Sequence, residues 1–313
     1  MSQKVIFDTD PGQDDAVALL AALASPEAIE VLGIVTVAGN IPLSHTTRNA
    51  LSLVELAGRT DVPVFAGCER PMLRELVTAE HVHGPTGLDG PDLPSPAVTA
   101  GAQHGVDFLI ETIRAHPPQS IRLLALGPLT NIGVAFAKAP DIATRLKDIV
   151  LMGGGYFEVG NITPAAEFNI YVDPEAASIV FGSGAAITVL SLDVTHQMRS
   201  TRARIAAFRG LGNRSGLAVA AMLDFSEGFD VEKYQWEGAP LHDPCVTAFV
   251  LAPEIFTGRS VNVEIETGSD LTRGMSVVDY WGVTGRRKNA FWVRSGDPDA
   301  YFTLLSERVG RLP

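Results

Sequence analysis

The sequence is poor in cysteine and short of basic residues, and each shortage excludes a class of protein. Its two cysteines, Cys68 and Cys245, stand far apart and without CxxC spacing, which argues against a disulfide scaffold or a structural zinc site. Lysine and arginine number 24 against 36 aspartates and glutamates, so the formal net charge is −12. Because no long basic run offsets this charge, we expect no nucleic-acid partner and no membrane partner.

The sequence also lacks a long uninterrupted hydrophobic stretch. Asp8 and Asp10 interrupt the first apolar run, so we expect no signal peptide. The longest apolar region, residues 16–38, is broken by Pro26 and by two glutamates, which argues against a membrane span. Together with the scarcity of cysteine, these features predict a cytoplasmic protein.

Short apolar runs alternate with helical patterns over most of the chain. Strands are predicted at 4–8, 29–37, 62–66, 120–126, 148–153 and 186–192. Helices are predicted at 14–24, 44–58 (with Ser44 as N-cap), 101–116, 130–139 and 173–181. Apolar strands that alternate with helices are typical of a parallel sheet covered on both faces. The predicted fold class is therefore α/β, an open and mostly parallel sheet flanked by helices.

The pattern changes after residue 255. Three segments there, 260–267, 274–280 and 289–295, resemble antiparallel strands, and a terminal helix follows near 298–310. The stretch 84–101 is rich in glycine and proline and predicts a long loop. The sequence shows no repeat and no clean linker. We therefore expect one domain, residues 1–313, with a small antiparallel extension near the C-terminus.

Polar residues follow several of the predicted strands. Asp8 and Asp10 end the first strand, Asn40 follows the second, and Asp193 follows the strand at 186–192. In open parallel sheets, ligands bind just beyond the carboxyl ends of the strands. We therefore expect the functional site at this edge of the sheet.

The segment VIFDTDPGQDD, residues 5–15, brings four aspartates close together. Helix capping accounts for Asp14 and Asp15, because the positive end of a helix dipole favours acids. Capping does not account for Asp10, nor for Asp8 at a strand end. Carboxylates held a few ångströms apart raise one another's pKa unless a cation lies among them. The residues alone leave capping and a hard divalent cation such as Ca²⁺ equally open.

Two further motifs have ordinary explanations when they stand alone. In GAPLHDPC, residues 238–245, Asp243 precedes Pro244 and predicts a helix start. Phe225 and Phe229 have the spacing of a helix face that points to the core, and Tyr234 and Trp236 follow nearby. The first aspartates could also belong to a DxDx[TV] phosphotransferase, but Gly12 stands where that motif has threonine or valine.

Six segments, taken together and in order, resemble the inosine-uridine-preferring nucleoside hydrolase family. They are DTDPGQDDAVALL, VTVAGN, HGPTGLDG, ALGPLTNI, VLMGGGYFEVGNITPAAEFNIYVDPEAA and GAPLHDPC. The later segments EGAPLHDPCVTAF and GMSVVDYWGVTG look most similar to bacterial pyrimidine-preferring members. The resemblance implies hydrolysis of the N-glycosidic bond of ribonucleosides to ribose and free base, with uridine and cytidine favoured and inosine a further substrate.

The resemblance also implies a calcium site and a catalytic base. The family holds Ca²⁺ with residues that match Asp10, Asp15 and Asp243, and with a main-chain carbonyl that falls on Leu126. Many relatives carry threonine at that last position, but only its main-chain oxygen is needed. The residue that matches Asp10 also serves as general base on a calcium-bound water.

The remaining site residues implied by the resemblance contact the sugar or lie near the base. Ribose hydroxyls are held by residues that match Asp14, Asn40, Asn161, Glu167 and Asn169. Met152 and Phe168 match residues that line the sugar pocket, although on pattern alone they predict core positions. His242 matches a histidine beside the leaving base. His83 matches one on a mobile loop over it, although without the resemblance it predicts solvated surface.

The resemblance leaves base preference and assembly open. A nonspecific or purine-preferring hydrolase is the first alternative, and a non-catalytic, calcium-stabilised nucleoside-binding protein is the second. Family members are commonly homodimers or homotetramers, so we expect a homo-oligomer whose ligand is a small ribonucleoside. We expect the residues that choose the base to lie around 76–90 and 222–240.

Overall fold

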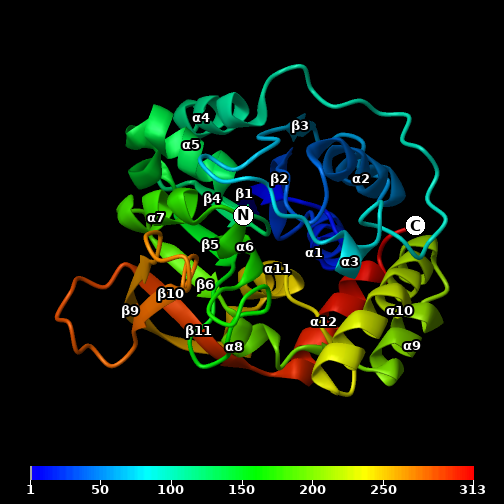
Figure 1. Cartoon of the computed structure of the whole chain (residues 1–313). Coiled ribbons are helices and arrows are strands. Elements are labelled where there is room, and N and C mark those ends of the chain that lie inside the picture. The colour runs from blue at the N-terminus through cyan, green and yellow to red at the C-terminus, as the bar shows by residue number, and fades with distance from the viewer. Residues whose placement is uncertain (1) are drawn as a thin grey trace.

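The computed structural model describes residues 2–313, except for the side chains of Phe229, Asp230, Glu232 and Tyr234. A single sheet runs through the centre of the molecule with helices packed against both faces (Figure 1). Its strands are β1 (Gln3–Thr9), β2 (Ile29–Thr36), β3 (Val64–Ala66), β4 (Ile121–Ala125), β5 (Asp148–Met152), β6 (Ile187–Leu190), β9 (Phe256–Ile265), β10 (Ser276–Asp279) and β11 (Ala290–Gly296).

The strand order is β10-β9-β11-β6-β5-β4-β1-β2-β3, nine strands in all. The segment from β3 to β6 is parallel throughout, and β11 pairs in parallel with β6. Strand β9 runs antiparallel to both β11 and β10. The predicted mostly parallel sheet is therefore confirmed, and its antiparallel extension is continuous with the main sheet. A separate short pair joins β7 (Arg199–Ser200) to β8 (Ala239–Pro240).

Both faces of the central strands are buried, which explains why their sequences are almost wholly apolar. In β1, Val5 and Phe7 pack into the core on one face, while Ile6 packs into a second core on the other. The first core is completed by α1 (Gln13–Leu23), α2 (Leu43–Leu56), α9 (Arg202–Gly210), α10 (Arg214–Tyr234), α11 (Pro244–Leu251) and α12 (Pro298–Val309). The second is covered by α4 (Gly105–Ala115), α5 (Thr130–Lys138) and α7 (Pro174–Gly182).

Three short helices belong to the loops beyond the strand ends: α3 (Glu80–His83), α6 (Phe168–Val172) and α8 (Leu192–Thr195). The sequence patterns did not predict them, because an element of four or five residues is too short to show a helical period. They also left α9 unassigned. The predicted loop at 84–101 contains no helix, and its one bridge joins Gly101 to Phe65.

Two local predictions are wrong. Ser44 is not the N-cap of α2, because the helix begins at Leu43 with Pro42 in the capping position. Phe225 does not face the core, since 44% of it is exposed on α10. The side chain of Phe229, its expected partner, lies outside the described residues.

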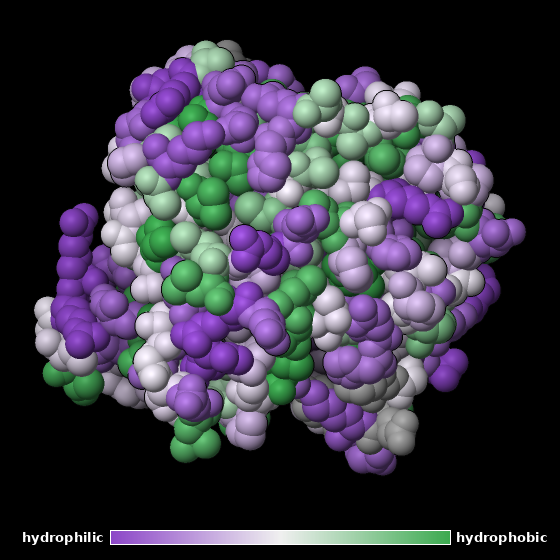
Figure 2. Space-filling view, turned by 45° about the horizontal axis from the view of Figure 1, so that its top comes forward, coloured by the Kyte–Doolittle hydropathy of each residue, from purple (hydrophilic) through white to green (hydrophobic). Residues whose placement is uncertain are grey.

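Hydrophilic and hydrophobic residues are intermixed over the face seen in the space-filling view (Figure 2). Among residues 2–313, no helix combines the length and apolar character that crossing a bilayer demands.

Candidate functional site

The turn between β1 and α1 is held in shape by the side chain of Asp15. Its Oδ1 accepts a hydrogen bond from Thr9 Oγ1 at 2.5 Å, and its Oδ2 accepts one from the Gly12 amide at 3.0 Å. Asp15 is the third residue of the helix, so it caps the turn from inside, as its position in the sequence predicts. The capping interpretation is therefore correct for Asp15, but it does not explain the other aspartates of this turn.

Asp10 lies under the turn and is bound to the end of β2. Its Oδ2 accepts from the Asn40 amide at 2.7 Å, and the Asn40 side chain donates to the Asp10 carbonyl at 3.1 Å and to Asp15 Oδ2 at 3.2 Å. A Cβ at Gly39 would lie 2.1 Å from Asp10 Oδ2, and one at Gly127 would lie 2.3 Å from Asp10 Oδ1. Only glycine fits at these two positions, so the buried carboxylate is enclosed by backbone.

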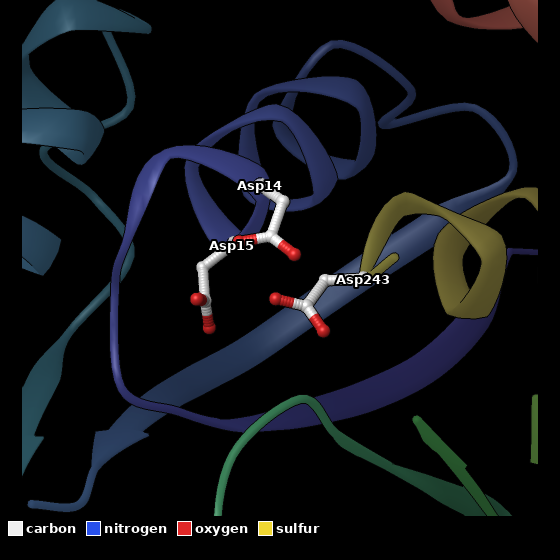
Figure 3. Close-up of side chains that lie close together, drawn as sticks. All are labelled: Asp14, Asp15 and Asp243. Carbon is white, nitrogen blue, oxygen red and sulfur yellow. The ribbon is translucent and has the colours of Figure 1, made fainter. Parts of the chain in front are cut away.

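Asp14, Asp15 and Asp243 bring their carboxylates together. One oxygen from each lies within 4.8 Å of the others, and Figure 3 shows the three side chains directed toward a common space. Asp243 reaches this place because it immediately precedes α11, at the helix start that the sequence predicted. Asp10 is not part of this group of three. Asp14, which the resemblance places at the ribose, thus also lies close enough to Asp15 and Asp243 to share a cation with them.

The pKa values of these carboxyls show how unfavourable the crowding is. Burial, followed by the charges of Asp15 and Asp14, raises the pKa of Asp10 well above its usual range. Burial and the charges of Asp14, Asp15 and Asp10 do the same to the pKa of Asp243. Burial and the Asp14 charge raise the pKa of Asp15 to about 6. Among the described side chains, no lysine or arginine forms an ion pair with any of these aspartates.

The donor set fits a hard divalent cation. Every charged ligand atom is a carboxylate oxygen, which is what Ca²⁺ and Mg²⁺ prefer. Among the described residues, Asp10 Oδ1 is buried and has no hydrogen-bond partner. The Leu126 carbonyl, at the end of β4, lines the same cavity and accepts from Asn169 Nδ2 at 2.7 Å. A cation would satisfy the orphaned oxygen and relieve the repulsion among the carboxylates.

Glu167 and Asn169 form the opposite wall of the site. Glu167 caps α6 and accepts backbone hydrogen bonds from Asn169 at 2.9 Å, Ile170 at 3.2 Å and Gly154 at 2.9 Å. Asn169 Nδ2 also reaches the Met152 carbonyl at 3.3 Å, so its amide links the ends of β4 and β5. Burial raises the pKa of Glu167 to about 7, even though the three amides oppose that rise.

Two histidines border the cavity from different elements. His242 Nδ1 lies 2.7 Å from Thr195 Oγ1, and burial lowers the pKa of the ring to about 4. His83, the last residue of α3, has Nδ1 2.7 Å from Gln13 Oε1, and burial lowers its pKa as well. Burial thus disfavours the charged form of both rings. His81, on the same short helix, lines the cavity from an exposed position.

These side chains surround one cavity of about 120 Å³. Every site residue implied by the family resemblance lines it except Asp10 and Asp15, which are wholly buried behind it. Those that line it are Asp14, Asn40, His83, Leu126, Met152, Asn161, Glu167, Phe168, Asn169, His242 and Asp243. The structure thus gathers residues that lie far apart in the sequence, from the ends of β1, β2, β4 and β5 and from the loops that carry α3, α6 and α11.

Several other lining residues escaped the sequence analysis as individuals, among them the six residues Gln13, Val82, Ile162, Leu223, Ser226 and Lys233. All except Gln13 and Ile162 fall within 76–90 or 222–240, the two segments expected to choose the base. Gln13 belongs to the aspartate-rich segment 5–15, and this position was the one signal in the sequence that could have indicated a place at the site. Asp193, in contrast, does not line this cavity. It accepts from the amides of residues 156–158 and from Trp292 Nε1, and so it braces a loop.

Asp8 and Trp236 also lie away from the cavity lining. Asp8 Oδ2 accepts from Asn131 Nδ2 at 2.8 Å, and burial raises the pKa of Asp8 to about 7. Trp236 packs edge-on against His196 and beneath the Arg199 guanidinium. The side chain of Tyr234 lies outside the described residues.

Comparison with known proteins gives one consistent result. Residues 5–303 match the family described as inosine-uridine preferring nucleoside hydrolase. The pyrimidine-specific ribonucleoside hydrolase RihA of Salmonella typhimurium is 45% identical over 99% of both chains. The structure of a purine-preferring ribonucleoside hydrolase from Gardnerella vaginalis superposes with a TM-score of 0.92 and 31% identity over 98% of both chains. A plant nucleoside hydrolase, PpNRh1, follows with a TM-score of 0.88 and 33% identity over 99% of both chains.

Proposed function

Because the chain belongs to the inosine-uridine preferring nucleoside hydrolase family, whose members hydrolyse the N-glycosidic bond of ribonucleosides, we propose that it is a calcium-dependent hydrolase that prefers uridine and cytidine. The hydrolysis itself follows from the family. The observation that carries the proposed metal dependence is the set of crowded, buried carboxylates, which have no lysine or arginine partner among the residues that the structure describes. The pyrimidine preference is supported by the 45% identity to RihA.

We assign the cation to Asp10, Asp15, Asp243 and the main-chain carbonyl of Leu126. When bound, Ca²⁺ would act as a Lewis acid toward water and keep these carboxylates ionised at neutral pH. Asp14 lies within ligand distance of the same space. Asp14 can contact both the ribose and the cation, since a carboxylate has two oxygens.

Asp10 is the proposed general base. Its Oδ1 is the orphaned oxygen of the site, while Oδ2 is already bound by the Asn40 amide. Oδ1 has two lone pairs, so beside a bound cation it can still take a proton from the attacking water. The backbone that encloses the carboxylate at Gly39 and Gly127 holds it in one orientation, which a base needs in order to act on a fixed water.

Asp14, Asn40, Asn161, Glu167 and Asn169 are proposed to hold the ribose hydroxyls. All five line the cavity, and they offer both donors and acceptors to a sugar. Cleavage of an N-glycosidic bond develops positive charge on the ribose ring in an oxocarbenium-like transition state. The carboxylates of Asp14 and Glu167 would stabilise that positive charge and so accelerate cleavage of the N-glycosidic bond. Met152 and Phe168 supply the apolar part of the sugar pocket.

His242 is proposed to assist departure of the base. Its partner at Nδ1 is a hydroxyl, which either donates or accepts. When Thr195 donates to Nδ1, the ring hydrogen lies on Nε2 and can be donated to the leaving base as negative charge develops there. Replacing His242 with alanine should therefore slow uridine hydrolysis by about 10²-fold but slow p-nitrophenyl riboside, whose leaving group needs no proton, far less. Equal losses on the two substrates would show that His242 does not activate the leaving group.

Steady-state rates on uridine, cytidine, inosine and adenosine, with and without a calcium chelator, test the proposal as a whole. We expect uridine and cytidine to give the highest kcat/KM, and chelation to abolish turnover until Ca²⁺ is restored. Faster hydrolysis of purine nucleosides would favour the purine-preferring alternative. Intact nucleosides in the presence of calcium would favour a protein that only binds them.

Three further expectations remain proposals. One sheet takes strands from residue 3 to residue 296, which supports a single domain over 1–313. Cys68 and Cys245 are both free, which supports a reducing cytoplasm. Assembly as a homodimer or homotetramer follows from the family resemblance alone, and sedimentation would test it.

A further inference from the structure

Gln13 has no role in the mechanism above, yet its side chain lies between the aspartate turn and His83. It is the first residue of α1 and is 1% exposed. Its Nε2 donates to the His83 carbonyl at 2.9 Å and reaches the Asp89 carbonyl at 3.4 Å. Its Oε1 lies 2.7 Å from His83 Nδ1. One amide therefore contacts both the backbone and the ring of the same histidine.

These contacts fix the direction of the hydrogen bond to the ring. Two carbonyl oxygens face one end of the Gln13 amide, so that end must be the NH₂ group, because an oxygen there would meet only acceptors. The other end is then Oε1, which only accepts. His83 Nδ1 must therefore carry the hydrogen.

A neutral imidazole carries one hydrogen, so protonation at Nδ1 leaves Nε2 with a lone pair. The ring also has little freedom to turn, since it packs against the backbone of the turn. A Cβ at Gly12 would lie 2.5 Å from His83 Nδ1 and 2.8 Å from Cε1. With Nδ1 bound to Gln13, Nε2 is the ring nitrogen left for a ligand in the cavity that His83 lines.

We propose that Gln13 is a positioning residue that holds His83 as the Nδ1-protonated tautomer, so that Nε2 accepts a hydrogen bond from an O–H or N–H of the nucleoside. The proposal rests on the function proposed above and deepens it. It gives the two histidines of the site different roles. His83 accepts from the substrate and does not protonate the leaving base, whereas His242, whose partner is a hydroxyl, retains that capacity.

The test is the tautomer of His83, read from the ¹⁵N chemical shifts of histidine-labelled protein near pH 8. In the wild type we expect the hydrogen on Nδ1. Gln13→Met keeps the length of the side chain but offers no acceptor or donor, so both tautomers should become populated. We also expect kcat/KM for uridine to fall about tenfold, the cost of one lost hydrogen bond in a buried site.

Asn49→Ala is the matched control. Asn49 Nδ2 donates to the Pro11 carbonyl at 3.0 Å and to the Thr86 carbonyl at 2.8 Å, so it joins the same loop to the same turn without contacting the ring. We expect this variant to leave the tautomer unchanged and to retain kcat/KM within about threefold.

The proposal fails if wild-type His83 carries its hydrogen on Nε2, or if Gln13→Met leaves the tautomer as it was. It also fails if Asn49→Ala shifts the tautomer equally, since Gln13 would then act only by anchoring the loop. The wild-type spectrum decides the first point even if a variant does not fold. A wild type that shows the Nδ1 tautomer but cleaves no nucleoside would overturn the proposed function and leave the assignment of Gln13 intact.

Discussion

The amino and carboxyl ends of the same strands differ in whether their charged side chains form ion pairs. At the amino ends, Arg122 of β4 forms a double hydrogen bond to Asp148 of β5 at 2.8 and 2.9 Å, and Lys4 of β1 pairs with Glu30 of β2 at 2.7 Å. At the carboxyl ends, Asp10 and its neighbours have no basic partner among the described side chains. A paired charge contributes to stability, whereas an unpaired buried charge costs stability and persists only where something else requires it.

The difference indicates which end of the sheet carries function. An ion pair at the amino ends is complete, so it has no capacity left for a ligand. The carboxylates at the other end lack a positively charged partner among the described side chains. A bound cation would supply that positive charge. Substitutions at matching positions on the two ends should therefore separate catalysis from stability, and the three predictions below test that separation.

The largest effect is expected from Asp10→Asn. The amide retains the shape of the side chain but cannot take a proton, and it is a weaker cation ligand, so kcat for uridine should fall by 10²-fold or more. Calorimetric titration with Ca²⁺ should show weaker binding in the same variant.

Asp148→Asn is the control for this substitution, because it makes the same chemical change at the amino end of the sheet. Its kcat should stay within about twofold of the wild type, since Asp148 contacts Arg122 and not the cavity. The proposed mechanism is wrong if Asp10→Asn turns over at the wild-type rate.

The second prediction concerns stability against pH without cation. In the folded protein the pKa values of Asp8, Asp15 and Glu167 rise to about 7, 6 and 7, from ordinary values of 3.8, 3.8 and 4.5. These groups bind protons more tightly in the folded chain. Their stabilising contribution to the free energy of unfolding is thus complete below about pH 4, and it is lost as the pH rises to about 7. His242, with its pKa of about 4, and His83, whose pKa burial also lowers, act oppositely. Asp10 and Asp243, whose pKa values burial raises, act in the same direction as the three carboxyls.

Calcium should reverse that loss, because it binds the deprotonated carboxylates. In thermal unfolding, the rise in Tm on replacing chelator with Ca²⁺ should be small at pH 5 and roughly 5–10 °C at pH 8. A rise that is the same at both pH values would mean that the cation does not compete with protons at these carboxyls.

The smallest effect is expected from Arg122→Met. It leaves Asp148 partly buried and unpaired, so the free energy of unfolding should fall by about 1–3 kcal/mol in urea denaturation. Uridine turnover should not change. A large loss of kcat in this variant would contradict the separation between the two ends of the sheet.

Each of the nine strands of the sheet overlaps a predicted one. In the central strands, such as β1 and β5, burial on both faces leaves a short apolar run that the sequence shows directly. In β10, buried and exposed residues alternate, which is the pattern of a strand with one face covered. The same patterns did not reveal that β11 joins β6, because pairing between strands over a hundred residues apart depends on tertiary packing. Ser44 was misplaced as a cap because Pro42 also suits a helix start, and local signals do not rank the two.

The site was predictable in part. Strand ends alone pointed to Asp8, Asp10 and Asn40, and only the family resemblance separated their roles. His83, Met152 and Phe168 look ordinary in the sequence, and they line the cavity because α3, β5 and α6 meet there. Gln13 was overlooked because a single amide has no periodicity, and its contacts with His83 span 70 positions.

The Asn169 amide, which links the carbonyls at the ends of β4 and β5, suggests how this scaffold could diversify. It anchors the wall proposed to hold the ribose to the carboxyl ends of two central strands of the sheet. The other side of the cavity is drawn from Val82, Ile162, Leu223 and Ser226, none of which belongs to a strand of that sheet. Substitutions there leave the proposed ribose and cation contacts in place, so this scaffold can take a different base while it keeps the same reaction.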